Sequence, residues 1–247
     1  MLPLSDQNLP GRGIAWLTVA FIVVNVAVFL VLQLGPDGDA FTYGYSAIPA
    51  EITGGVDLTE PQTIVIDGER VQIPQEPGPS PILLTLLTSM FMHGGWLHLG
   101  GNMLFLWIFG DNVEHTIGAP LYLLFYLAAG VVGSLAQVWV DPTSVIPTLG
   151  ASGAISGVLG AYVVLFPSNR VLVFLFRVLV YVPAIVAIGL WAALQFFLGF
   201  AAIAETQQTG GVAYMAHVGG FVTGVAVGLL ARTMGIGRGG TPLRPAF

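Results

Sequence analysis

Charged residues divide this chain into six long stretches that contain none. The charge-free windows cover residues 13–36, 77–110, 115–140, 142–169, 178–204 and 206–231. A helix needs about 20 apolar residues to cross a bilayer core of about 30 Å, and every window is longer than that. The sequence therefore predicts an all-α polytopic membrane protein with six transmembrane helices.

The composition excludes several other classes of protein. Only 8% of the 247 residues are charged, whereas soluble domains average about 25%, so the chain is not an ordinary soluble globule. A net charge of −6 argues against a nucleic acid partner. The chain has no cysteine and only four scattered histidines, so we expect no disulfide, no bound metal and no cofactor.

The positions of the arginines predict how the spans are oriented. With six spans, six of the seven arginines fall on one side of the membrane, which the positive-inside rule identifies as cytoplasmic. These six are Arg12, Arg170, Arg177, Arg232, Arg238 and Arg244. The chain then divides into a cytoplasmic N-terminus (1–13), a first span (14–34), an outer loop (35–92), a core with the second to sixth spans (93–235) and a cytoplasmic tail (236–247).

The outer loop is the only sizeable extramembrane piece that we expect. Apolar and polar residues alternate in 63–66 and 70–73 around the turn dipeptide Asp67-Gly68, which predicts a small β-hairpin. Residues 82–92 are apolar with interspersed threonines and precede the second span. This segment is predicted to form a short helix at the outer membrane interface.

Four polar residues from three spans are expected at a similar depth on the outer side. His98 and Asn102 are four apart, so a helix places them on one face. Ser152 opens the fourth span within a Gly-Ala-Ser-Gly turn, and His217 lies about a turn and a half into the sixth. A lone serine or asparagine in a span more often links helices. Together, however, these residues supply a nucleophilic hydroxyl with the base and the oxyanion donors that it needs.

Three stretches around these residues resemble the signature motifs of the rhomboid intramembrane serine proteases. They are Gly150-Ala-Ser-Gly-Ala-Ile-Ser-Gly157, His93-Gly-Gly-Trp-Leu-His-Leu-Gly-Gly-Asn102 and Ala216-His-Val-Gly-Gly-Phe-Val-Thr-Gly224. Their order, spacing and assignment to spans match the family over about residues 80–235. The resemblance implies a six-helix rhomboid-like bundle, which agrees with the span count obtained from the charges.

The resemblance also implies a role for each polar residue. Ser152 corresponds to the nucleophile and His217 to the general base, while His98 and Asn102 match positions that line the oxyanion hole. The backbone N–H of Ser152 is a further expected donor, because this residue opens a helix whose dipole favours negative charge. One position departs from the family: some rhomboids have an aromatic residue that stacks on the histidine, four residues after the serine, and this chain has Ser156 there.

The chemistry expected at this site is that of a serine-histidine dyad. No carboxylate lies in any span, so nothing in the spans can act as the aspartate of a triad, and the patterns of aspartyl and zinc proteases are missing. The serine and the histidine must be within hydrogen-bond reach, which requires close packing of the fourth and sixth helices. Small-residue faces for this packing are supplied by Gly153, Gly157, Gly220 and Gly224.

The predicted function is that of an intramembrane serine endopeptidase that cleaves single-span membrane proteins near the outer face. Its partners are then transmembrane protein substrates and membrane lipid, and its expected location is a bacterial plasma membrane. The polar loop 205–211 is expected to admit water. The alternative is a catalytically inactive rhomboid-like protein that binds transmembrane segments, although such members usually lack the serine or the histidine. A channel or transporter would distribute polar residues through the full membrane depth, and here they are confined to the outer half.

Overall fold

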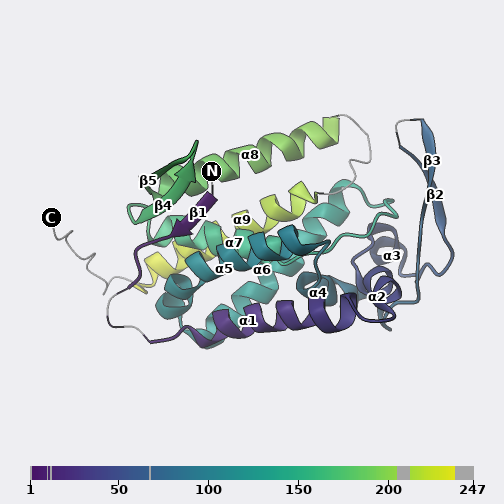
Figure 1. Cartoon of the computed structure of the whole chain (residues 1–247), viewed down its shortest axis with the longest axis horizontal. Helices are drawn as coiled ribbons and strands as arrows, with labels where there is room; N and C mark the ends of the chain where they lie inside the picture. The colour runs from purple at the N-terminus through teal and green to yellow at the C-terminus, as the bar shows by residue number, and fades with distance from the viewer. Residues whose placement is uncertain (1, 10, 12, 67, 205–211, 237–247) are drawn as a thin grey trace.

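The protein is a bundle of long helices with a small β-sheet element at each end (Figure 1). This computed structural model describes residues 2–9, 11, 13–66, 68–204 and 212–236. We call the end of the bundle near residues 62–73 the hairpin end and the end near residues 170–183 the sheet end. The main helices are α1 Trp16–Ala27, continued by the π-helical segment Val28–Gln33, α5 Trp96–Ile117, α6 Ala119–Val140, the shorter α7 Ser152–Leu165, α8 Ala184–Ala204 and α9 Tyr214–Thr233.

Four of these helical segments are long and apolar enough to cross a membrane. They are Trp16–Gln33, Ala119–Val140, Ala184–Ala201 and Tyr214–Thr233. A fifth candidate is α5 taken together with the segment Ile82–Phe91, from which it is bent by 79°. The fold is thus that of a helical, polytopic membrane protein. Among the described residues, fewer than the expected six helices are long enough to span a membrane, because α7, expected as the fourth span, has only 14 residues.

The short helix α7 lies in the interior of the bundle. Ten consecutive residues, from Gly153 to Tyr162, are buried, and α5, α6, α8 and α9 pack around the helix. A helix enclosed by other helices does not need to match the thickness of the bilayer. The chain reaches the start of α7 through an extended segment, which is held by a bridge between Thr148 and Ala47 and by the Gly150 N–H bond to the Ser89 carbonyl.

The hairpin end is built from the loop expected over residues 35–92. Strands β2 and β3 pair antiparallel with Gln62 opposite Ile73, so the hairpin expected from the sequence is present. The expected interfacial helix consists of three short helical pieces. The elements of this end are α2 Gly38–Tyr45, α3 Pro49–Gly54, β2 Gln62–Ile66, β3 Glu69–Ile73, the 3₁₀ turn Ile82–Leu84, α4 Thr85–Thr88 and the 3₁₀ turn Ser89–Phe91.

A second sheet, not expected from the sequence, lies at the opposite end. β4 Arg170–Leu175 and β5 Val178–Pro183 form an antiparallel hairpin, and β1 Leu2–Ser5 pairs with the free edge of β4. The turn residues Phe176 and Arg177 have φ angles of 46° and 70°, a conformation usually reserved for Gly, Asn or Asp. The sheet brings the first residues of the chain to the end of the bundle where α7 and α9 finish.

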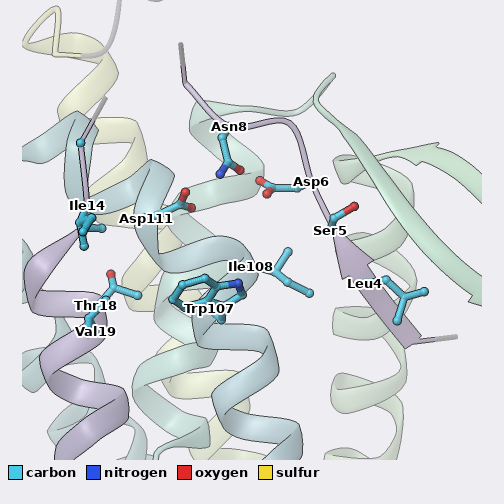
Figure 2. A pocket seen from close by; sticks show the side chains of 12 residues that line it. Leu4, Ser5, Asp6, Asn8, Ile14, Thr18, Val19, Trp107, Ile108 and Asp111 are labelled. Atoms are coloured by element: carbon cyan, nitrogen blue, oxygen red, sulfur yellow. The ribbon is translucent and has the colours of Figure 1, made fainter. Parts of the chain in front are cut away.

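Side-chain hydrogen bonds hold the N-terminal segment against the helices. Asp6 accepts hydrogen bonds from Tyr162 Oη and Asn112 Nδ2, and Asn112 Oδ1 accepts the N–H of Leu9. A cavity of about 380 Å³ is lined by residues of this segment, α1 and α5, and Asp6 and Asp111 extend toward one another across it (Figure 2). Burial raises the pKa of Asp6 from 3.8 to about 7, and the neighbouring carboxylate of Asp111 acts in the same direction.

The raised pKa of Asp6 predicts a pH-dependent stability. The folded protein binds the Asp6 proton more tightly than the unfolded chain, so the stability linked to this proton is fully present below about pH 4 and is lost as the pH rises through about 7. We expect the melting temperature of wild type minus that of Asp6→Asn to fall between pH 5 and pH 8 in detergent. Glu60→Gln, at an exposed acid near the hairpin end, serves as control. Parallel pH curves for wild type and Asp6→Asn would contradict this.

The helices α7 and α9 pack backbone against backbone. A β-carbon built on Gly220 would lie 1.9 Å from the carbonyl oxygen of Gly153, and one on Gly224 would lie 1.8 Å from that of Gly157. Real β-carbons do not approach backbone oxygens so closely, so the present crossing requires glycine at both positions of α9. These are the four glycines that the sequence predicts at this contact.

This packing predicts that one added methyl group at the helix crossing lowers the stability of the protein. Gly220→Ala and Gly224→Ala should each lower the melting temperature in detergent, because the added β-carbon forces the two helices apart and overpacking costs about 1–3 kcal/mol. Gly189→Ala in α8 is the matched control, since a β-carbon there meets no atom within 4 Å. Melting temperatures of the α9 variants equal to that of the control would refute the backbone contact.

Candidate active site

The crossing of α7 and α9 brings Ser152 and His217 together. Ser152 is the first residue of α7, and His217 lies in the first turn of α9. The hydroxyl oxygen Oγ of Ser152 is 2.8 Å from Nε2 of His217. The two side chains are thus within hydrogen-bond distance although 65 residues separate them in the chain. An imidazole in this position can remove the hydroxyl proton, which is what a serine nucleophile requires.

Gly150 allows the polar groups to crowd around Ser152. Its φ angle is +133°, a value that L-residues rarely adopt. A β-carbon at this position would lie 2.9 Å from the imidazole of His98 and 3.6 Å from Ser152 Oγ. Glycine is therefore required both by the backbone conformation and by the approach of the His98 ring. On the other side, Ser156 Oγ donates to the carbonyl of Ser152 at 2.5 Å, within the first turn of α7.

His98 and Asn102 present hydrogen-bond donors from α5. The Nδ1 atom of His98 accepts the N–H of Gly94 at 3.3 Å, so in the neutral ring the proton resides on Nε2, the atom that lies near Gly150. Asn102 follows one turn later, and its Nδ2 is buried without a hydrogen-bond partner among the described residues. A buried donor left unpaired is costly, and such exceptions usually have a functional reason.

The surroundings of His217 include groups that the sequence motifs did not indicate. Its second ring nitrogen, Nδ1, is 2.8 Å from the amide oxygen Oε1 of Gln195 on α8. The ring of Trp191, one turn before Gln195, lies 6.1 Å from the imidazole, and that of Tyr214 lies 6.5 Å away at 90°. These neighbours support the imidazole of His217, a role that an aromatic residue at the position of Ser156 has in some rhomboids. Hydropathy places Gln195 in a span but gives no indication of its partner.

A small polar cavity lies beside Ser152. Its volume is about 20 Å³, enough for one water molecule. Hydroxyl groups and backbone atoms from four segments line it, among them Ser89, Ser134, Thr148 and Ser152. Within the part of the chain that the structure describes, no group of three His, Asp or Glu residues is arranged to hold a metal ion. The polar loop expected to admit water, residues 205–211, lies outside the described residues.

Comparison with known proteins identifies the family. The sequence profile of the rhomboid domain matches residues 81–233, well over half of the chain. The chain therefore belongs to the rhomboid family, and it is an integral membrane protein with the helical bundle described above. The match includes Ser152, His217 and the α5 residues of the site.

Relatives with known names come from several organisms. The chain is 36% identical to Rhomboid protein 1, mitochondrial, of Saccharomyces cerevisiae over 59% of this chain and 41% of the yeast protein. It is 35% identical to Rhomboid protease GluP of Bacillus subtilis over 76% of this chain and 35% of GluP. It is 28% identical to RHOMBOID-like protein 4 of Arabidopsis thaliana over 92% of this chain and 57% of that protein.

The chain spans about a third to somewhat over half of the length of these relatives. The yeast relative is named as mitochondrial, whereas GluP comes from a bacterium, so these relatives do not favour the expected bacterial plasma membrane over a mitochondrial membrane.

Proposed function

We propose that this protein is an intramembrane serine endopeptidase that cleaves single-span membrane proteins. The observation that carries the proposal is the 2.8 Å approach of Ser152 Oγ to His217 Nε2 in a chain of the rhomboid family. Its similarity to a relative named a rhomboid protease supports the same activity.

In the proposed reaction, His217 acts first as base and then as acid. Its Nε2 takes the proton of Ser152 as Oγ attacks the carbonyl carbon of the scissile peptide bond. The protonated imidazole then gives this proton to the leaving amine, and an acyl-enzyme remains on Ser152. Water attacks the acyl group with the same base, which releases the second product. The hydroxyl-lined cavity beside Ser152 is suited to hold such a water molecule.

The developing oxyanion would be stabilised by donors that are already in place. Nδ2 of Asn102 is buried without a partner among the described residues, and Nε2 of His98 lies on the side of Gly150. The backbone N–H of Ser152 adds the positive end of the α7 dipole. Donors fixed in a site of low polarity contribute strongly, because they need no reorganisation as charge develops.

The proposed substrate reaches the dyad sideways from the lipid. Apolar side chains of α5 and α8, among them Phe105, Phe109 and Trp191, surround a cavity of only about 30 Å³, so in this proposal α5 and α8 separate to admit a transmembrane segment. Helical peptide carbonyls are engaged in hydrogen bonds, so the cleaved segment should contain Gly or Pro that weakens its helix.

We propose six spans with both termini cytoplasmic, so that cleavage occurs near the outer face.

The dyad predicts a simple pattern of activity. Purified wild type in detergent should cleave a single-span substrate with a glycine near its outer end, and should leave a soluble protein such as casein intact. Ser152→Ala and His217→Ala should each reduce cleavage to background, because the nucleophile or its base is removed. Thr223→Ala, on the same helix as His217, serves as control. Cleavage by Ser152→Ala at the wild-type rate would refute the assignment.

The same assay separates protease from binding protein. A wild type that binds the transmembrane substrate in a pull-down but never cleaves it would favour the catalytically inactive alternative. Preferential cleavage of casein would contradict the class of substrate while leaving the serine chemistry in place.

Replacing Asn102 by an apolar residue should impair catalysis without lowering stability. Asn102→Leu is expected to lower kcat about 100- to 1000-fold, as loss of an oxyanion donor does in other serine proteases. Because Nδ2 is buried without a partner among the described residues, the same change should leave the melting temperature equal or higher. Kinetics and thermal denaturation in detergent measure the two effects. A kcat within threefold of wild type would rule out a role for Asn102 in the oxyanion hole.

A further inference from the structure

The imidazole of His217 has one hydrogen-bond partner on each ring nitrogen. Nε2 is 2.8 Å from Ser152 Oγ, and Nδ1 is 2.8 Å from Gln195 Oε1. Gln195 lies on α8, a helix that contributes no residue to the dyad or to the expected oxyanion donors. Among the described residues, its amide is therefore the one side-chain group that forms a hydrogen bond to the histidine on the side opposite to the serine.

The two contacts together determine which ring nitrogen carries the proton. An amide oxygen can only accept, so Nδ1 of His217 must be the protonated nitrogen when it bonds to Gln195. Nε2 then has a free lone pair that faces the hydroxyl of Ser152, which is the form a general base requires. In Ser-His-Asp triads the aspartate holds the tautomer and orientation of the histidine in this way. Here the acceptor is neutral.

Packing around this contact restricts its geometry. Trp191 and Gln195 are four apart on α8, and His217 and Phe221 are four apart on α9, so each pair shares a helix face. The ring of Trp191 lies 6.1 Å from that of His217 and 6.2 Å from that of Phe221. The indole thus packs beside the imidazole and helps to keep it in line with the amide. A neutral amide also costs less to bury in a membrane than a carboxylate.

We infer that Gln195 is a positioning residue that orients His217 and fixes its Nε2 as the proton acceptor for Ser152. This inference rests on the proposed function, since it concerns the base of the same reaction. Gln195 itself touches no reacting atom. It takes the place of the third member of a triad, while Trp191 supplies aromatic packing beside the imidazole.

Substitutions that differ only in hydrogen-bond capacity test this role. Gln195→Leu and Gln195→Met keep an apolar side chain of similar size without the amide acceptor, and each should lower kcat about 10- to 100-fold with little change in KM, the loss expected for one hydrogen bond to a group that becomes charged. Gln195→Glu retains an acceptor and should recover most of the activity. Gln137→Leu is the matched control, because Gln137 also links two helices, through the N–H of Met215, but does not contact His217.

A spectroscopic measurement distinguishes orientation from simple helix packing. In protein labelled with ¹⁵N-histidine, the signal that is lost in His217→Ala should report a proton on Nδ1 in wild type and Gln195→Glu, and a mixture of tautomers in Gln195→Leu and Gln195→Met. Gln137→Leu should keep the wild-type signal even where its melting temperature falls.

Three results would overturn the inference. The first is a wild-type kcat in both Gln195→Leu and Gln195→Met. The second is a loss of kcat in Gln195→Glu as large as that in the Leu and Met variants, and the third is an unchanged His217 signal in all variants. Cleavage that persists in Ser152→Ala would instead refute the proposed function, so the two failures can be told apart.

Discussion

Where α7 and α9 cross, glycines leave no side chain between the two backbones. The site depends on this contact, because a residue with a β-carbon at Gly220 or Gly224 would push the helices apart. Ser152 and His217 lie on the hairpin side of the same crossing, one near the start of each helix. Their 2.8 Å separation tolerates little displacement. Small residues are a general means of helix association in membranes, where no hydrophobic driving force between helices exists.

The second constraint is the cost of polar groups in an apolar bundle. α7 is short and enclosed, so the polar groups at its start are surrounded by protein rather than by lipid. Ser152, His217 and Gln195 satisfy one another in a chain of hydrogen bonds, whereas Asn102 keeps a buried donor without a partner among the described residues. In the proposed mechanism, that donor is satisfied only when negative charge develops on the substrate, so stability is given up for catalysis.

The sequence predicted the helical bundle, the hairpin over residues 63–73 and the glycine contact, because charge-free windows, turn dipeptides and glycine spacing depend on local residues. It missed the sheet at the other end. Phe176 and Arg177 form its turn without the usual Gly or Asn, and β1 pairs with a strand about 170 residues away. It also missed the pairing of Gln195 with His217, because hydropathy gives the depth of a residue but not the direction of its side chain.

The most direct test of the central claim is the site of covalent labelling by a fluorophosphonate, mapped by mass spectrometry in detergent-solubilised protein. A reactive serine beside a base is required for this reaction, whatever the natural substrate. We predict a single adduct on Ser152 that is absent from His217→Ala. An adduct on another serine, or labelling of Ser152 that does not depend on His217, would contradict the proposed dyad.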